Sequence, residues 1–226
     1  MNIAYNLDKV LQRIDESVNK LPNKNAQVAL LAVSKTRSWE KILQAYEQGQ
    51  RHFGESYVQE SIEKINKLKD YDICWHFIGP IQSNKTNKIA QHYDWVHSVD
   101  RVKIAQRLSD QRPDNMPPIN VCVQLNISNE DSKSGAGVEQ LLELAQIIDK
   151  LPNLTLRGLM AIPQKLSDYD SQTKTFAELH NYYQQMRKQF DTVDTLSMGM
   201  SQDLEAAIAE GSNMVRIGTD IFGPRD

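Results

Sequence analysis

The stretch that decides the fold is 195-TLSMGMSQDLEAAIAEGSNMVRIGTDIFG-223, close to the end of the chain. Two short strand candidates, residues 195–197 (TLS) and 214–217 (MVRI), flank a segment of helical composition, residues 203–210. Short buried strands joined by a helix are typical of a right-handed βαβ unit with parallel strands. The stretch therefore predicts an α/β fold whose last two strands lie side by side.

The same alternation of short apolar runs and amphipathic segments extends back to the start of the chain. Several runs are almost wholly apolar, as strands buried on both faces of a parallel sheet must be. Eight strands in 226 residues predict a single (β/α)8 TIM barrel domain spanning residues 1–226, since such barrels contain about 200–250 residues. A doubly wound open sheet is the alternative, but residues 32–36 lack the glycine-rich turn that usually follows its first strand. The expected strands are residues 28–33, 51–53, 75–78, 95–97, 119–125, 154–160, 195–197 and 214–217.

The segments between the strands carry apolar residues at helical spacing, which predicts helices packed on the sheet. The segment 128–137 (SNEDSKSGAG) is the most polar, and we expect it to be the most mobile. The clearest apolar stripes are Leu7, Val10, Leu11, Ile14 and Val18; Val58, Ile62, Ile65 and Leu68; Leu141, Leu142, Ala145 and Ile148; and Phe176, Leu179, Tyr183 and Met186.

Composition and charge argue against several classes of protein. The net charge of −3 is unlike the basic surface of a nucleic-acid-binding protein. No apolar run forms a signal peptide or approaches the roughly 18 residues of a membrane span, so we expect a cytoplasmic protein. Cys74 and Cys122 lie in apolar runs, which predicts buried reduced thiols. The five histidines are scattered without a recognised ligand spacing, so we expect no metal site.

The ends of the last two expected strands carry residues suited to binding phosphate. Barrel sites lie at the C-terminal ends of the strands, and the loops after strands seven and eight often hold phosphate. We expect Ser201 to cap the helix 203–210, whose free N–H groups attract an anion. Gly218 and Thr219 add N–H donors and a hydroxyl. Asp203 counts against the site, because a carboxylate repels phosphate.

Two cations are expected to face one ligand. Lys35 directly follows the first strand, and Arg216 lies in the eighth, which neighbours the first in a closed barrel. A desolvated lysine close to another cation attacks aldehydes as a Schiff-base nucleophile, although a lysine at this place also fits a solvated strand end. Amine, arginine and phosphate loops together indicate a site for a phosphorylated aldehyde.

Five segments are AVSKT (32–36), HFGESYVQE (52–60), WHFIGPIQSNK (75–85), RGLMAI (157–162) and LSMGMSQDLEAAIAEGSNMVRIGTDIFG (196–223). They resemble the YggS/PROSC family of pyridoxal 5'-phosphate (PLP) homeostasis proteins. The resemblance extends in the same order across essentially the whole chain, and the last segment alone is long enough to be specific. It implies a PLP-bound barrel like the N-terminal domain of alanine racemase.

By this resemblance, Lys35 is the lysine that holds PLP as a Schiff base, and Arg216 faces the pyridine nitrogen. Ser56 stands where the family usually has an asparagine near the cofactor, and its hydroxyl reaches less far. Asn84 and Lys85 belong to a family motif with no assigned role. The cofactor-binding residues that we expect are Lys35, Ser56, Met200, Ser201, Arg216, Gly218 and Thr219.

The resemblance implies a protein that buffers PLP or delivers it to apo PLP-dependent enzymes, with no catalytic activity of its own. A PLP-dependent racemase is one alternative, but 226 residues leave no room for the β-rich domain that supplies alanine racemase with a catalytic tyrosine across its dimer. A PLP-free lysine aldolase or phosphosugar isomerase is another, and Arg216 and the family match argue against it. Without the second domain we expect a monomer that binds neither nucleic acid nor membranes.

Overall fold

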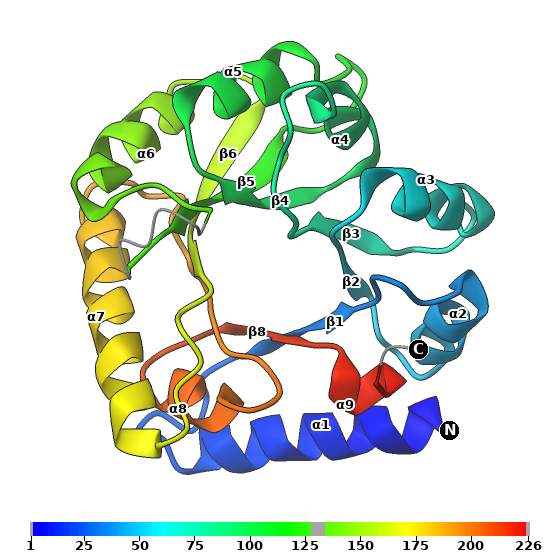
Figure 1. Cartoon of the computed structure of the whole chain (residues 1–226), viewed down its shortest axis with the longest axis vertical. Helices are drawn as coiled ribbons and strands as arrows, with labels where there is room; N and C mark the ends of the chain where they lie inside the picture. Colours follow the sequence, from blue (N-terminus) through cyan, green and yellow to red (C-terminus); the bar gives the residue numbers. More distant parts are fainter. Residues whose placement is uncertain (1, 128–133, 225–226) are drawn as a thin grey trace.

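The strands close into a parallel barrel, in which each strand neighbours the next along the chain (Figure 1). The computed structural model describes residues 2–127 and 134–224. Leu31 of the first strand pairs with Arg216 of the last, so the sheet has no open edge, and the doubly wound alternative is excluded. The strands are β1 (Ala29–Val33), β2 (His52–Glu55), β3 (Cys74–Phe77), β4 (Trp95–Val99), β5 (Ile119–Leu125), β6 (Leu154–Ala161), β7 (Thr195–Ser197) and β8 (Met214–Ile217).

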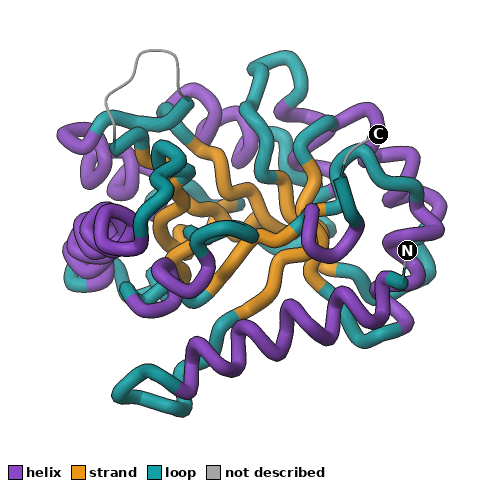
Figure 2. The backbone as a smooth tube through the Cα atoms, turned by 60° about the horizontal axis from the view of Figure 1, so that its bottom comes forward, coloured by secondary structure: helices purple, strands orange, loops and turns teal. Residues whose placement is uncertain are grey.

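Helices surround the barrel, and α1 precedes the first strand and packs against α8 and α9 (Figure 1). Figure 2 shows α1 as a long helix below the strands. No helix in the described ranges is long and apolar enough to cross a lipid bilayer. The helices are α1 (Ile3–Asn19), α2 (Trp39–Glu47), α3 (Val58–Lys67), α4 (Thr86–His92), α5 (Val102–Asp110), the 3-10 turn η1 (Val138–Gln140), α6 (Leu141–Asp149), α7 (Tyr169–Arg187), α8 (Leu204–Ala209) and α9 (Thr219–Phe222).

The strand predictions are confirmed, with ends that differ by at most two residues. The fully apolar runs were the clearest signal, because strands enclosed by helices are buried on both faces. The predicted polar segment 128–137 lies partly outside the described residues, at positions 128–133.

The helical stripes are confirmed where the helix faces only apolar neighbours, as in α7, whose four predicted residues are all buried. Three stripes are wrong in detail. In α6, Leu142 is only partly buried and the buried face includes Leu144, which was not predicted. In α1, Leu11 is 38% exposed, since it lies at the edge of the buried face. In α3 the buried face holds Ser61 and Lys64, while Val58 is only partly buried. Lys64 points inward because its ammonium pairs with the buried carboxylate of Glu55.

Candidate cofactor-binding site

A cavity of about 440 Å³ lies at the C-terminal ends of β1 and β8. This volume is within the range of about 300–1,000 Å³ that small-molecule sites occupy. The cavity also borders the loops that follow β6 and β7. Six of the seven residues predicted from the sequence line it, namely Lys35, Met200, Ser201, Arg216, Gly218 and Thr219.

Ser56 is the predicted residue that does not line this cavity. It follows β2 and its backbone packs against Gly79, where an added Cβ would come within 2.4 Å of the Ser56 carbonyl oxygen. Ser56 therefore lies in the contact between the loops that follow β2 and β3. A contact between its hydroxyl and a ligand remains a prediction from the family pattern.

Lys35 follows β1 and is half-buried at the cavity wall. The next residue, Thr36, has a φ of 63°, in the left-handed region that β-branched residues rarely adopt. Its backbone N–H donates to the Glu60 Oε1 atom at 2.7 Å, which helps to hold this conformation. Such backbone strain persists only where surrounding contacts enforce it, and it is common at functional sites.

A buried ion pair fixes the chain on the other side of Lys35. The Lys64 ammonium donates to Glu55 Oε1 at 2.9 Å and to the Ser34 carbonyl at 3.0 Å. The Ser34 hydroxyl donates to the same Glu55 oxygen at 2.7 Å. Lys64 also pairs with Glu60. Burial raises the pKa of Glu55, and the charge of Lys64 opposes that rise. The network therefore fixes the backbone at Ser34 and Thr36, on either side of Lys35. The sequence analysis did not predict it.

Arg216 is buried, and its guanidinium is held by the ends of two neighbouring strands. It donates to the Ser197 carbonyl at 2.6 Å, to the Ser197 hydroxyl at 2.8 Å and to the Ala161 carbonyl at 2.8 Å. Burial lowers the pKa of Arg216 to about 10, so the group is still charged at neutral pH. The predicted inward direction of Arg216 is confirmed, and it presents a fixed cation to the cavity.

The prediction that Ser201 caps a helix is wrong. The helix α8 begins at Leu204, and Asp203 occupies the N-cap position. The Asp203 carboxylate accepts a hydrogen bond from the Met200 N–H at 2.6 Å and so closes the turn between these residues. Burial raises the pKa of Asp203, and the charge of Arg216 opposes that rise. Ser201 lines the cavity from the loop rather than from a helix end.

Two glycines allow the loops of the cavity to pack closely. Gly199 has a φ of 94°, and an added Cβ would lie 2.6 Å from the Ala207 Cβ of α8. A Cβ on Gly218 would lie 3.0 Å from the Val33 carbonyl oxygen at the end of β1. A side chain at either position would therefore push the loops after β7 and β8 away from their neighbours.

Arg13 of α1 joins the same two loops from outside the cavity. Its guanidinium pairs with Glu205 at 2.9 Å and with Asp220 at 2.7 Å, and it donates to the Ser201 carbonyl at 3.0 Å. Asp220 lines the cavity, so this pairing offsets a negative charge beside the expected phosphate site. Nothing in the sequence indicated this role, because the partners of Arg13 lie 188 to 207 residues away along the chain.

Cations outnumber acids on the cavity wall. Among residues 2–127 and 134–224, four basic side chains, Lys35, Arg37, Lys165 and Arg216, line it together with two acids, Asp203 and Asp220. Such a surface attracts an anionic ligand. Amine, guanidinium and loop N–H groups together can bind a molecule that has a phosphate group and an aldehyde.

Comparison with known proteins agrees with this geometry. The chain matches the family model of the alanine racemase N-terminal domain over residues 6–226. It is 51% identical to the pyridoxal phosphate homeostasis protein of Vibrio cholerae, over 100% of this chain and 97% of that one. The chain belongs to the pyridoxal phosphate homeostasis protein family. The resemblance seen in the sequence is thereby confirmed.

Other members and solved structures extend the comparison. The homeostasis protein of Pseudomonas aeruginosa is 53% identical over 99% of this chain and 96% of its own. PipY of Synechococcus elongatus PCC7942, whose structure was solved with PLP bound, is 35% identical with a TM-score of 0.84, over 98% of this chain and 100% of PipY. Alanine racemase of Corynebacterium glutamicum is 14% identical with a TM-score of 0.68, over 98% of this chain and 60% of the racemase. That likeness shows a shared fold alone.

Proposed function

We propose that this chain binds PLP in the cavity between β1 and β8 and serves as a PLP carrier or buffer. The observation that carries the proposal is the convergence of Lys35, Arg216 and the loops after β7 and β8 on one cavity. PLP bound to the homologous PipY supports the same choice of ligand. The whole chain, residues 1–226, would act as one PLP-binding unit.

The residues present fit the chemical groups of PLP. The Lys35 amine would hold the aldehyde carbon as a Schiff base, and the loop residues Ser201, Gly218 and Thr219 would hold the phosphate. Arg216 would face the pyridine nitrogen, and Met200 would pack beside the ring. PLP supplies an electrophilic aldehyde and a ring that accepts electrons from bound amines. The chain itself supplies the amine, the anion-binding loops and a fixed positive charge.

Two features of the cavity bear on the choice between a carrier and a racemase, and Arg216 alone does not decide it, because the resemblance implies an arginine at this place in alanine racemase too. Arg216 is positively charged and only donates hydrogen bonds, so it disfavours a proton on the pyridine nitrogen. A protonated nitrogen is what makes PLP a strong electron sink. Among the described residues, no tyrosine lines the cavity to move a substrate proton. A PLP-free aldolase or isomerase is the remaining alternative, and a visible absorption band in the purified protein would argue against it.

The experiment that tests the carrier function measures transfer of PLP from the loaded protein to an apo PLP-dependent enzyme. We expect the enzyme to regain activity as the protein loses its absorption band. A small-molecule trap for free PLP serves as the control, because a carrier delivers PLP faster than release into solution permits. If PLP reaches the enzyme no faster than the trap shows it to be released into solution, the protein does not deliver PLP directly and acts only as a buffer.

Removing either hydroxyl from the phosphate loops is expected to weaken PLP binding about tenfold or more. A hydrogen bond to a charged group contributes about 1.5–3 kcal/mol, and about 1.4 kcal/mol is a factor of ten. Titration of PLP into Ser201→Ala and Thr219→Ala measures this. Ser83→Ala is the control, because Ser83 follows β3 and does not line the cavity. Unchanged affinity in both loop variants would refute the assigned phosphate contacts.

Amino acids are expected to exchange their α-proton very slowly in this protein. The measurement is deuterium incorporation into L- and D-alanine by the PLP-loaded wild type and by Arg216→Glu. A carboxylate at position 216 favours a proton on the pyridine nitrogen, so we expect faster exchange per bound PLP in the variant. Exchange by the wild type at about 10 per second, the rate of an ordinary enzyme, would contradict the carrier function.

The protein is expected to be a monomer in solution. Light scattering on the purified protein should give a mass near the 25.8 kDa of the chain. A concentration-independent mass near twice that value would refute the expectation.

A further inference from the structure

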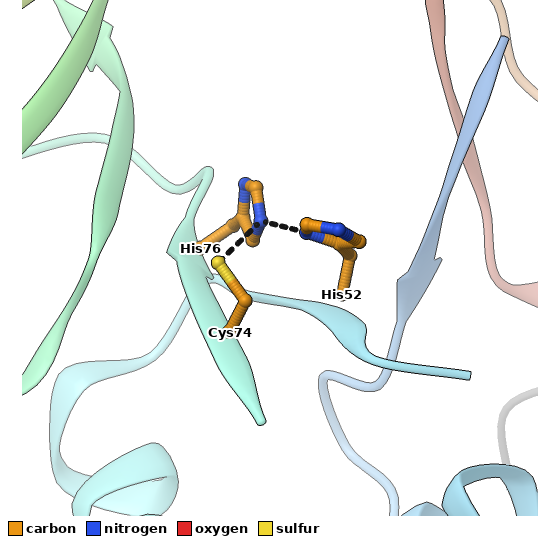
Figure 3. A group of neighbouring side chains, drawn as sticks. All are labelled: His52, Cys74 and His76. Atoms are coloured by element: carbon orange, nitrogen blue, oxygen red, sulfur yellow. Dashed lines mark hydrogen bonds between the residues drawn. The ribbon is translucent and has the colours of Figure 1, made fainter. Parts of the chain in front are cut away.

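Three side chains that commonly bind metals meet at the N-terminal end of the barrel (Figure 3). His52 and Cys74 are the first residues of β2 and β3, and they are paired in the sheet register. His76 lies two residues along β3, on the same face as Cys74, since side chains alternate along a strand. The cluster therefore lies at the end of the barrel opposite to the cofactor cavity.

The distances from His76 Nε2 to the other two ligand atoms are near those between the ligands of a tetrahedral zinc ion. The His52 Nδ1 atom is 2.9 Å from His76 Nε2, and the Cys74 Sγ atom is 3.4 Å from the same nitrogen. All three ligand atoms lie within 4.8 Å of one another. With Zn–N bonds of about 2.05 Å and a Zn–S bond of about 2.3 Å, tetrahedral angles place ligand atoms roughly 3.3–3.6 Å apart. The half-buried His52 and Cys74 side chains would have to adjust to bring all three pairs to this spacing.

The second ring nitrogen of His76 has a partner that orients it toward such a site. His76 Nδ1 lies 2.8 Å from His97 Nε2, and His97 Nδ1 lies 3.1 Å from the Ser197 hydroxyl. The Trp95 indole stacks on the His76 ring at 5.3 Å between centroids. A histidine that ligates a metal usually donates its other N–H to a fixed partner, which sets its tautomer. His76 would thus present the Nε2 lone pair to the cluster.

Cys74 would bind the ion as a thiolate and the two histidines as neutral rings, which are the forms in which these side chains ligate zinc. Binding would release the thiol proton to solvent as the S–Zn bond forms.

We propose that His52, Cys74 and His76 form a three-ligand site for Zn²⁺, with water in the fourth position. Three protein ligands and one open position are an established zinc arrangement, and soft thiolate with imidazole selects Zn²⁺ over Mg²⁺ or Ca²⁺. Both His52 and Cys74 are half-buried, so solvent supplies the fourth ligand. The proposal departs from the expectation of no metal site, and it is independent of PLP binding.

The test begins with the wild-type protein as purified, dialysed against a chelator. Competition with a chromophoric chelator measures the affinity and stoichiometry for Zn²⁺ alone. Difference spectra after Co²⁺ addition report the ligand type, because a thiolate ligand gives an intense charge-transfer band. We expect one Zn²⁺ per chain, that cobalt band, and protection of Cys74 from alkylation when Zn²⁺ is present.

Variants then identify the ligands. Cys74→Ala and His52→Gln should each weaken Zn²⁺ binding by more than the roughly 10–100-fold that follows loss of an outer-shell partner. Cys122→Ala and His92→Gln are the matched controls, and each should bind like the wild type. Circular dichroism checks that every variant folds.

Three results would overturn the site. They are a wild-type cobalt spectrum without the thiolate band, alkylation of Cys74 that Zn²⁺ leaves unchanged, and Zn²⁺ affinity that is equal in the wild type and both ligand variants. The first two need no variant, so a substitution that fails to fold does not rescue the proposal.

Discussion

The variant Lys64→Met is expected to lower the free energy of unfolding by about 3–5 kcal/mol, the usual cost of removing one partner of a buried ion pair. Glu55 is fully buried, and one of its carboxylate oxygens already has no hydrogen-bond partner among the described residues. Loss of Lys64 would leave the buried Glu55 carboxylate without its paired cation. It would also release the Ser34 carbonyl, so PLP affinity should fall as well.

Urea unfolding followed by circular dichroism measures the change in stability, with the slope m compared between variants. Lys67→Met is the matched control on the same helix, and its exposed cation over the Trp39 ring should contribute no more than about 1 kcal/mol. The double variant Glu55→Gln with Lys64→Met should regain much of the loss, because it no longer buries an unpaired charge. A loss below about 1 kcal/mol in Lys64→Met would show that the pair does not stabilise the fold.

The variant Lys35→Ala is expected to lose the Schiff base completely. Without the amine, bound PLP has no imine absorption and borohydride traps no adduct. Weaker, noncovalent binding of PLP through the phosphate loops should persist, because Ser201 and Thr219 are unchanged. Absorption spectra and mass spectrometry of the reduced protein measure both effects.

Lys165→Ala is the matched control for this substitution. Lys165 lines the same cavity from the loop after β6, so it tests whether any nearby lysine suffices. We expect the control to keep one adduct per chain. If Lys35→Ala retained the adduct and Lys165→Ala lost it, Lys165 would be the nucleophile and the assignment to Lys35 would be wrong.

The fold was largely predictable from the sequence, because a parallel barrel leaves a strong local pattern. Strands such as β5 and β8 are buried on both faces and appear as short apolar runs. Helix faces were less predictable. The inner face of α3 holds Lys64, whose partner Glu55 lies nine residues away, and hydrophobic periodicity carries no signal for such a pair.

The cavity was predictable from strand ends alone. Lys35, Arg216 and Thr219 each end or follow a strand, and barrel topology brings the first and eighth strands together. The cap of α8 was not predictable in the same way. Ser201 and Asp203 are both good N-cap residues, and only the path of the turn selects Asp203.

Contacts between distant segments were beyond sequence reasoning. Arg13 reaches Asp220 across most of the chain, and neither residue stands in a motif. The His52, Cys74 and His76 cluster has the same origin, because the strand register rather than a short spacing brings the first two together. The resemblance to a known family carried residue roles that the physical pattern alone left open.

We propose that Lys35 holds PLP covalently at the junction of β1 and β8. The most direct test reduces the PLP-loaded wild-type protein with borohydride and maps the modified lysine by peptide mass spectrometry. We expect a single pyridoxyl adduct on Lys35, at one per chain. An adduct on Lys85, Lys165 or any other lysine, with Lys35 unmodified, would contradict it.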